Sequence, residues 1–110
     1  MGLSKTEIFT EEQNELAQIA KVLGHPARIA ILQHILKIDA CVCGDLVEEI
    51  GLAQATISQH LKELKNIGLI KGSVEGTSVC YCIDTENWNH VTQKINSFLN
   101  QDFLNIGNCC

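Results

Sequence analysis

Residues 45–83 read DLVEEIGLAQATISQHLKELKNIGLIKGSVEGTSVCYCI. Apolar residues at helical spacing predict a short helix at about 45–50 and a longer helix at about 54–66. Gly51 is placed to end the first of these helices, and a tight turn follows it. A short helix, a turn that contains glycine and a longer helix with a polar outer face are together typical of a helix-turn-helix.

Two β-prone runs follow the second helix, at about 69–74 and 78–83. Between them, Glu75-Gly76-Thr77 has the composition of a hairpin turn. A hairpin directly after a helix-turn-helix is a wing. The sequence therefore predicts a mainly α-helical fold with a β-hairpin wing, a winged helix-turn-helix with about five helices.

Three further helices are predicted outside this stretch, at about 11–23, 26–38 and 85–100. The helix at 26–38 is apolar nearly all round, so we expect it to be central and buried. A chain of 110 residues is about one domain's worth of protein, which excludes a multidomain enzyme. We expect one DNA-binding and dimerisation domain over 1–100 and a cysteine-terminated tail at 101–110.

Charge is distributed unevenly along the chain. The formal net charge of −5 argues against a protein that coats nucleic acid by bulk electrostatics. Residues 53–82 nevertheless carry three lysines against two glutamates, whereas the other residues hold five bases and eleven acids. The sequence has neither an apolar run long enough to span a bilayer nor the apolar start of a signal peptide, so we expect a cytoplasmic protein without a membrane partner.

The six cysteines come in three close pairs, Cys41/Cys43, Cys80/Cys82 and Cys109/Cys110. In a reducing compartment such pairs suit a shared soft ion better than a disulfide framework. Cys41 and Cys43 can serve one ion if their segment is extended or lies at the start of a helix, which is where the pattern puts them. A packing role for two small apolar residues is the simpler alternative.

Several motifs in order resemble the ArsR/SmtB family of metal-sensing winged-helix repressors, over about residues 10–100. They are HPAR at 25–28, CVC at 41–43 with DL at 45–46, QATISQHLK at 54–62 and NIGLI at 66–70. The resemblance implies a homodimer joined through its first and last helices. It also implies binding to double-stranded operator DNA with an inverted repeat, and repression that an ion relieves.

Within that family, the Cys-Val-Cys pair resembles the trivalent arsenic or antimony site of the arsenic-responsive repressors. Those proteins commonly take a third cysteine shortly after the pair, where this chain has Leu46 and Val47. We expect Cys109 or Cys110 to supply the remaining thiolate, because the tail can reach about 30 Å when extended. Cys80 and Cys82 are interpreted as packing residues first, with an accessory thiol role second. Zinc or cadmium stays open as an alternative ion.

The helix that begins at Gln54 is the predicted reading helix, since short polar groups can reach base edges and basic groups can hold phosphates. The expected base contacts are Gln54, Thr56, Ser58, Gln59 and His60. The expected phosphate contacts are Lys62, Lys65 and Lys71. A merely solvated helix face is the alternative interpretation.

Two other functions stay open. The same fold could sense cadmium, lead, zinc, thiol oxidation or persulfide through the same cysteines. A protein of another class, a thiol metallochaperone that does not bind DNA, would lack the steep salt dependence of operator binding. The chain shows no Ser/His/Asp set, phosphate loop or paired catalytic carboxylates, so we do not expect an enzyme.

Overall fold

The computed structural model describes residues 8–75 and 78–103. The elements of this part, in chain order, are α2 (Glu11–Leu23), α3 (Pro26–Ile38), α4 (Leu46–Ile50), α5 (Gln54–Asn66), β1 (Ile70–Glu75), β2 (Ser78–Ile83) and α6 (Thr85–Leu99). The mainly helical architecture with one antiparallel hairpin confirms the predicted fold class. Predicted and observed bounds agree to within one residue.

Local signals explain where the helices begin and end. Before α2, the Gln13 backbone N–H donates to Thr10 Oγ1 at 3.1 Å, and the Thr10 N–H donates to Gln13 Oε1 at 3.0 Å, which completes a capping box. Pro26 occupies the first turn of α3, where no N–H is needed. Gly51 ends α4 in the left-handed region, with a φ of 84°.

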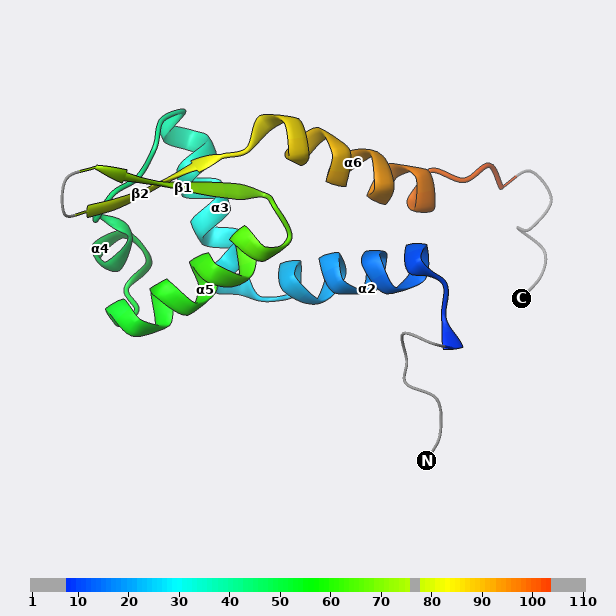
Figure 1. The fold of residues 1–110 in the computed structure, drawn as a ribbon, viewed down its shortest axis with the longest axis horizontal. Helices are drawn as coiled ribbons and strands as arrows, with labels where there is room; N and C mark the ends of the chain where they lie inside the picture. Colours follow the sequence, from blue (N-terminus) through cyan, green and yellow to red (C-terminus); the bar gives the residue numbers. More distant parts are fainter. Residues whose placement is uncertain (1–7, 76–77, 104–110) are drawn as a thin grey trace.

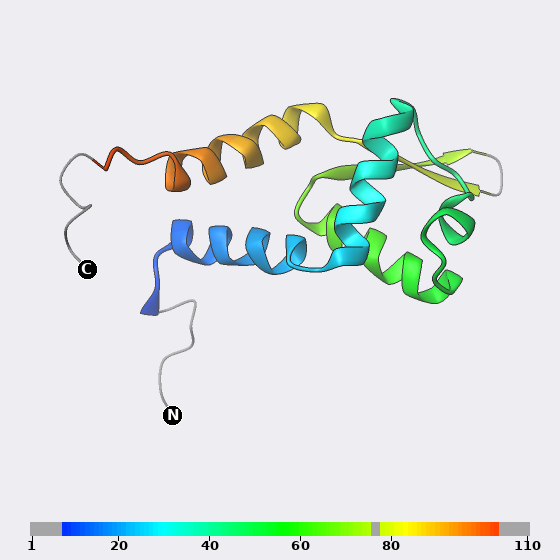
Figure 2. The same cartoon turned by 180° about the vertical axis from the view of Figure 1, so that it is seen from behind.

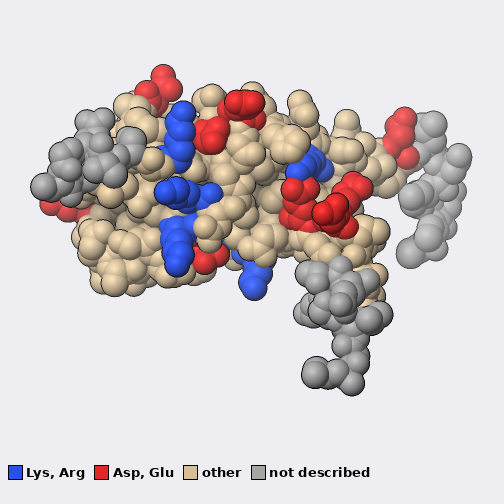
Figure 3. Space-filling view, in the orientation of Figure 1, with Lys and Arg blue, Asp and Glu red and all other residues tan. Residues whose placement is uncertain are grey.

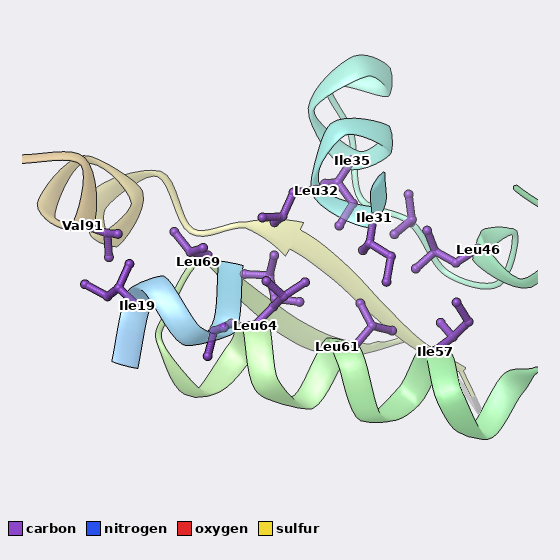
Figure 4. Packing of buried hydrophobic residues seen from close by; sticks show 13 residues of the cluster. Ile19, Ile31, Leu32, Ile35, Leu46, Ile57, Leu61, Leu64, Leu69 and Val91 are labelled. Carbon is purple, nitrogen blue, oxygen red and sulfur yellow. The ribbon is translucent and has the colours of Figure 1, made fainter. Parts of the chain in front are cut away.

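The core lies where α3, α5 and the hairpin meet (Figures 1 and 2). Figure 4 shows side chains of α5, among them Ile57 and Leu64, pointing toward Ile31 and Ile35 of α3. These four side chains are almost fully buried. Their burial fixes which side of α5 faces inward and therefore which side faces solvent.

The expectation that α3 is central and buried is met only in part. Ile31, Leu32 and Ile35 are buried, but Leu36 and Ile38 are 47% and 41% exposed. The helix packs against α2, α4, α5 and β2 with one side only, so apolar residues on its other side remain exposed to solvent.

Helices α2 and α6 lie side by side and extend away from the helix-turn-helix (Figures 1 and 2). Ile19 and Val91 are buried between them, and Lys94 forms an ion pair with Glu15. None of the described helices is long and apolar enough to cross a membrane.

Candidate DNA-binding face and thiol cluster

The outer face of α5 carries short polar groups near its start and lysines further along. The exposed residues on it include Gln54, Thr56, Ser58, Gln59, Lys62 and Lys65. Two hydrogen bonds order this face: Gln54 Nε2 donates to Ser58 Oγ at 3.1 Å, and Gln59 Nε2 donates to Glu63 Oε1 at 3.2 Å. The helix thus presents an exposed polar face, as the sequence predicts, with hydrogen-bonding groups near its start and lysines further along.

Basic side chains also gather around this helix. Figure 3 shows Lys and Arg side chains in a column over the region of β1 and α5, whereas Asp and Glu side chains cluster over α2. Lys62, Lys65 and Lys71 are all exposed. This separation of charge favours a polyanion at the α5 and wing side of the molecule, although the net charge is negative.

His60, an expected base contact, does not lie on this exposed outer face. Its side chain is buried, with 6% exposed, and Arg28 Nε donates to His60 Nδ1 at 3.1 Å. Burial lowers the pKa of His60, and the charges of His25 and Arg28 lower it further, which favours the neutral ring as a hydrogen-bond acceptor. The spacing of Ile57, His60, Leu61 and Leu64 is that of one buried helix face and could have revealed this position.

The contact between Arg28 and His60 gives the HPAR motif a structural role. Arg28 Nη1 also donates to the Val22 carbonyl oxygen at 3.3 Å, and the His25 ring packs edge-on against His60 at a centroid distance of 4.4 Å. One guanidinium therefore connects the end of α2, the start of α3 and the inner side of α5.

The segment between α3 and α4 is extended and pairs with β2. Val42 N–H donates to the Tyr81 carbonyl oxygen at 2.9 Å, and Tyr81 N–H donates to the Val42 carbonyl oxygen at 2.8 Å. Residues that flank such a doubly bonded antiparallel pair face each other directly, with Cα atoms about 4.5 Å apart. The facing residues here are Cys41 with Cys82 and Cys43 with Cys80, whose Cα–Cα distances are 4.3 and 4.1 Å.

Both facing pairs are joined as disulfides in the structure. Among the described residues of this disulfide-bonded form, no group of three or more His, Cys, Asp or Glu side chains is arranged to hold a metal ion. Because only a thiolate is a good ligand for a soft ion, reduction of these pairs is a condition for ion binding.

The cluster is accessible from one side. Cys41 and Cys43 are exposed, Cys82 is half-buried and Cys80 is only 2% exposed. Val42, between the first two, is buried in the core. Solvent and small ligands therefore reach the cluster through Cys41 and Cys43.

The structure brings together two cysteine pairs that sequence reasoning kept apart. Cys80 and Cys82 are not only packing residues, because both touch the predicted ligands Cys41 and Cys43. The equal spacing of the two Cys-x-Cys motifs could have indicated this contact, because two paired strands can place such motifs directly opposite each other. Cys109 and Cys110, the other expected ligands, lie outside the described residues.

The thiol cluster lies next to the helix-turn-helix. Asp45 precedes α4 directly, and its Oδ2 lies 2.9 Å from His34 Nε2 of α3. The hydrogen bond with His34 lowers the pKa of Asp45. A hollow lined by Cys43, Tyr81, Leu46 and Ser58, among others, separates the cluster from the start of α5. A change at the cysteines is thus positioned to act on both α4 and the wing.

Comparisons with known proteins show which chains this one resembles in sequence. Residues 25–71 match the model of "Bacterial regulatory protein, arsR family". The chain is 32% identical over 100 residues to a cadmium resistance transcriptional regulatory protein CadC homolog of Staphylococcus aureus, covering 89% of this chain and 79% of that protein. It is also 32% identical over 81 residues to an arsenical resistance operon repressor of Staphylococcus xylosus, covering 74% and 77% of the two chains.

A solved structure supports the fold. The homodimeric winged helix-turn-helix DNA-binding domain of a possible ArsR-family transcriptional regulator from Mycobacterium bovis matches with a TM-score of 0.65 and 20% identity. The match covers 96% of this chain and 94% of that chain. The winged helix-turn-helix fold is therefore confirmed.

Proposed function

The chain belongs to the arsR family of bacterial regulatory proteins, and on that premise we propose that it is a transcriptional repressor that trivalent arsenic or antimony releases from its operator. The family consists of DNA-binding transcriptional regulators and not of enzymes. The observation that carries the proposal is the placement of solvent-accessible Cys41 and Cys43 directly before the helix-turn-helix whose outer face is polar and basic.

The proposed operator contacts divide between α5 and the wing. Gln54, Thr56, Ser58 and Gln59 are the proposed base contacts, and Lys62, Lys65 and Lys71 the proposed phosphate contacts. The burial of Ile57 and Leu64 supports this assignment, because it turns those polar side chains away from the core. His60 is excluded from the set by its own burial.

We propose a homodimer formed through α2 and α6. An apolar groove runs between these helices, lined by Leu16, Leu23, Ile95, Phe98 and Leu99 among others, and Phe98 and Leu99 are 60% and 64% exposed. Apolar patches of this kind mark interfaces. Two copies of α5 would then read the half-sites of an inverted repeat about 34–36 Å apart, or a multiple of that distance.

The proposed inducer is a thiophilic ion, with Cys41 and Cys43 as two of its ligands. The similarity to an arsenical resistance operon repressor supports trivalent arsenic or antimony, and the similarity to a CadC homolog keeps cadmium as the main rival. The sequence predicts a third thiolate from Cys109 or Cys110, which lie outside the described residues.

Thiol oxidation is a second candidate for the signal, because Cys41 and Cys43 are each disulfide-bonded to β2 in the structure. In this alternative an oxidant removes two electrons and two protons from each facing pair, and the disulfides change DNA affinity without an ion.

A release experiment tests the proposal. An operator is first selected from random duplexes with reduced protein, and the complex is then titrated with arsenite, antimonite, cadmium, zinc or a thiol oxidant. Release by arsenite and antimonite at the lowest concentrations supports the proposal. Release by cadmium alone or by the oxidant alone assigns the alternative signal, and failure to select any duplex contradicts DNA binding.

A further inference from the structure

We propose that Cys80 and Cys82 of β2 form one thiol site with Cys41 and Cys43, in which trivalent arsenic or antimony is held by Cys41, Cys43 and one wing thiolate. The inference rests on the proposed function for the identity of the ion. It differs from the assignment of Cys109 or Cys110, because it takes the missing ligand from the strand that already faces the pair.

The backbone register places these sulfur atoms together. Val42 and Tyr81 form the doubly bonded pair, so Cys41 faces Cys82 and Cys43 faces Cys80 with Cα–Cα distances of 4.3 and 4.1 Å. Sulfur atoms close enough for a disulfide need only side-chain rotation to separate to the spacing of two ligands of one ion. The third ligand therefore requires no rearrangement of the main chain.

The shape of the cluster suits a pyramidal ion. Directly facing residues, and residues two apart on one strand, lie on the same face of a sheet, so all four cysteines offer sulfur from one side. Trivalent arsenic and antimony bind three thiolates on one side and keep a lone pair on the other. Zinc prefers four ligands arranged around it as a tetrahedron. A one-sided set of thiols thus favours the trivalent ions.

Cys80 and Cys82 are equivalent candidates in this geometry, because each faces one member of the Cys41/Cys43 pair. Either wing thiol completes a set of three, and the other is left over. The proposal therefore predicts redundancy: loss of one wing cysteine is tolerated, and loss of both is not.

Binding is a ligand exchange without a redox step. Arsenous acid, As(OH)₃, reacts with three thiols: three As–S bonds form, three As–O bonds break, and the three thiol protons leave with the hydroxides as three molecules of water. The disulfides seen in the structure must first be reduced. Two molecules of a small thiol together supply two electrons and two protons for each protein disulfide and are joined to each other in a new disulfide.

The bound ion would connect the segment that leads into α4 with the second strand of the wing. Only the Val42–Tyr81 bridge joins the segment at 41–43 to β2 by backbone hydrogen bonds in the described residues. A set of As–S bonds beside this bridge would set the spacing between the wing and the helix-turn-helix. Both of these elements carry proposed DNA contacts, so the site is placed to alter their relative position.

Counting thiols in the reduced full chain tests the inference. Free thiols are titrated before and after addition of one equivalent of arsenite, for the wild type, Cys80→Ser, Cys82→Ser, Cys80→Ser/Cys82→Ser and Cys109→Ser/Cys110→Ser. We expect the wild type to lose three of its six thiols. The two single variants and the tail variant should also lose three, whereas the wing double variant should lose two and bind arsenite at least about tenfold more weakly.

Two results would overturn the inference: a tail variant that loses only two thiols, or a wing double variant that still loses three with unchanged affinity. Operator binding by each variant without arsenite controls for folding, and oxidised wild type should bind no arsenite. Failure of the proposed function gives a different result from failure of this inference, because the wild type would then lose three thiols to arsenite but would not release the operator.

Discussion

Val42 and Tyr81 exchange both of their backbone hydrogen bonds, and this one bridge aligns two Cys-x-Cys motifs that lie far apart in the sequence. The alignment makes Cys41 and Cys82 a facing pair with a sequence separation of 41 residues. The bridge also connects the entrance of the helix-turn-helix to the wing. The chemistry of the cysteines is therefore coupled by the backbone to the two elements that carry the proposed DNA contacts.

The register predicts which cysteines oxidise together. With Cys109 and Cys110 replaced by serine, Cys43→Ser/Cys80→Ser leaves the facing pair Cys41 and Cys82, which should form a disulfide readily with a mild oxidant. The matched variant Cys43→Ser/Cys82→Ser leaves the diagonal pair Cys41 and Cys80. Diagonal Cα atoms are about 7–8 Å apart, beyond ordinary disulfide range, so oxidation should be slower. Mass spectrometry of the two variants over time measures both rates, and equal rates would contradict the register.

Sequence readout should depend on the polar part of α5. Ser58→Ala or Gln59→Ala should weaken binding to the selected operator by about 1–3 kcal/mol and should affect random duplexes less. Lys62→Ala is the matched control, because loss of a phosphate contact should weaken both kinds of DNA alike and reduce the salt dependence. Fluorescence anisotropy measures the binding of each variant to the selected operator and to a random duplex. An equal loss for Ser58→Ala on both duplexes would remove the readout role.

The buried His60 should make the protein less stable at mildly acidic pH. Its pKa is lowered in the folded state, mainly by burial, whereas the unfolded chain has a histidine pKa of about 6.5. As the pH falls below that value the unfolded state takes up a proton that the folded state resists, so the free energy of unfolding decreases. Urea unfolding at several pH values measures the effect, and His60→Gln should show a shallower decrease than the wild type. Identical slopes would mean that His60 titrates alike in both states.

Most of the fold could be predicted because its signals are local. The capping box at Thr10, Pro26 at the start of α3 and Gly51 at the end of α4 act within a few residues of where they lie, and the structure confirms them. The pairing of Val42 with Tyr81 was not predictable in this way. It is a contact between segments that lie far apart in the sequence. A single bridge is too short to show the alternation of apolar and polar residues from which a strand register is predicted. The burial of His60 was missed for another reason: histidine is polar and was therefore placed on the outer face, although its spacing in the sequence is that of the buried face.

The dimer should depend on the apolar groove between α2 and α6. Phe98→Glu/Leu99→Glu places two charges in the groove and should give a monomer at micromolar concentration, because buried unpaired charges oppose association. Phe103→Glu is the control, since this residue is as exposed as Leu99 but does not line the groove. Sedimentation of the wild type and the two variants measures the oligomeric state of each. A wild type that is already monomeric would remove the basis for a palindromic operator.

Loss of the exposed cysteines should separate DNA binding from sensing. Cys41→Ser and Cys43→Ser each remove one of the two exposed thiols through which arsenite reaches the cluster, while leaving the outer face of α5 intact. Both variants should bind the operator as tightly as the wild type and should no longer release it with arsenite.

In the wild type, thermodynamic linkage requires that operator DNA weaken arsenite binding by the same factor by which arsenite weakens operator binding. Calorimetric titration of arsenite into free and DNA-bound protein measures one factor, and anisotropy with and without arsenite measures the other. Unequal factors would mean that release does not come from equilibrium binding at this site, and a Cys41→Ser variant that still responds would place the sensor elsewhere.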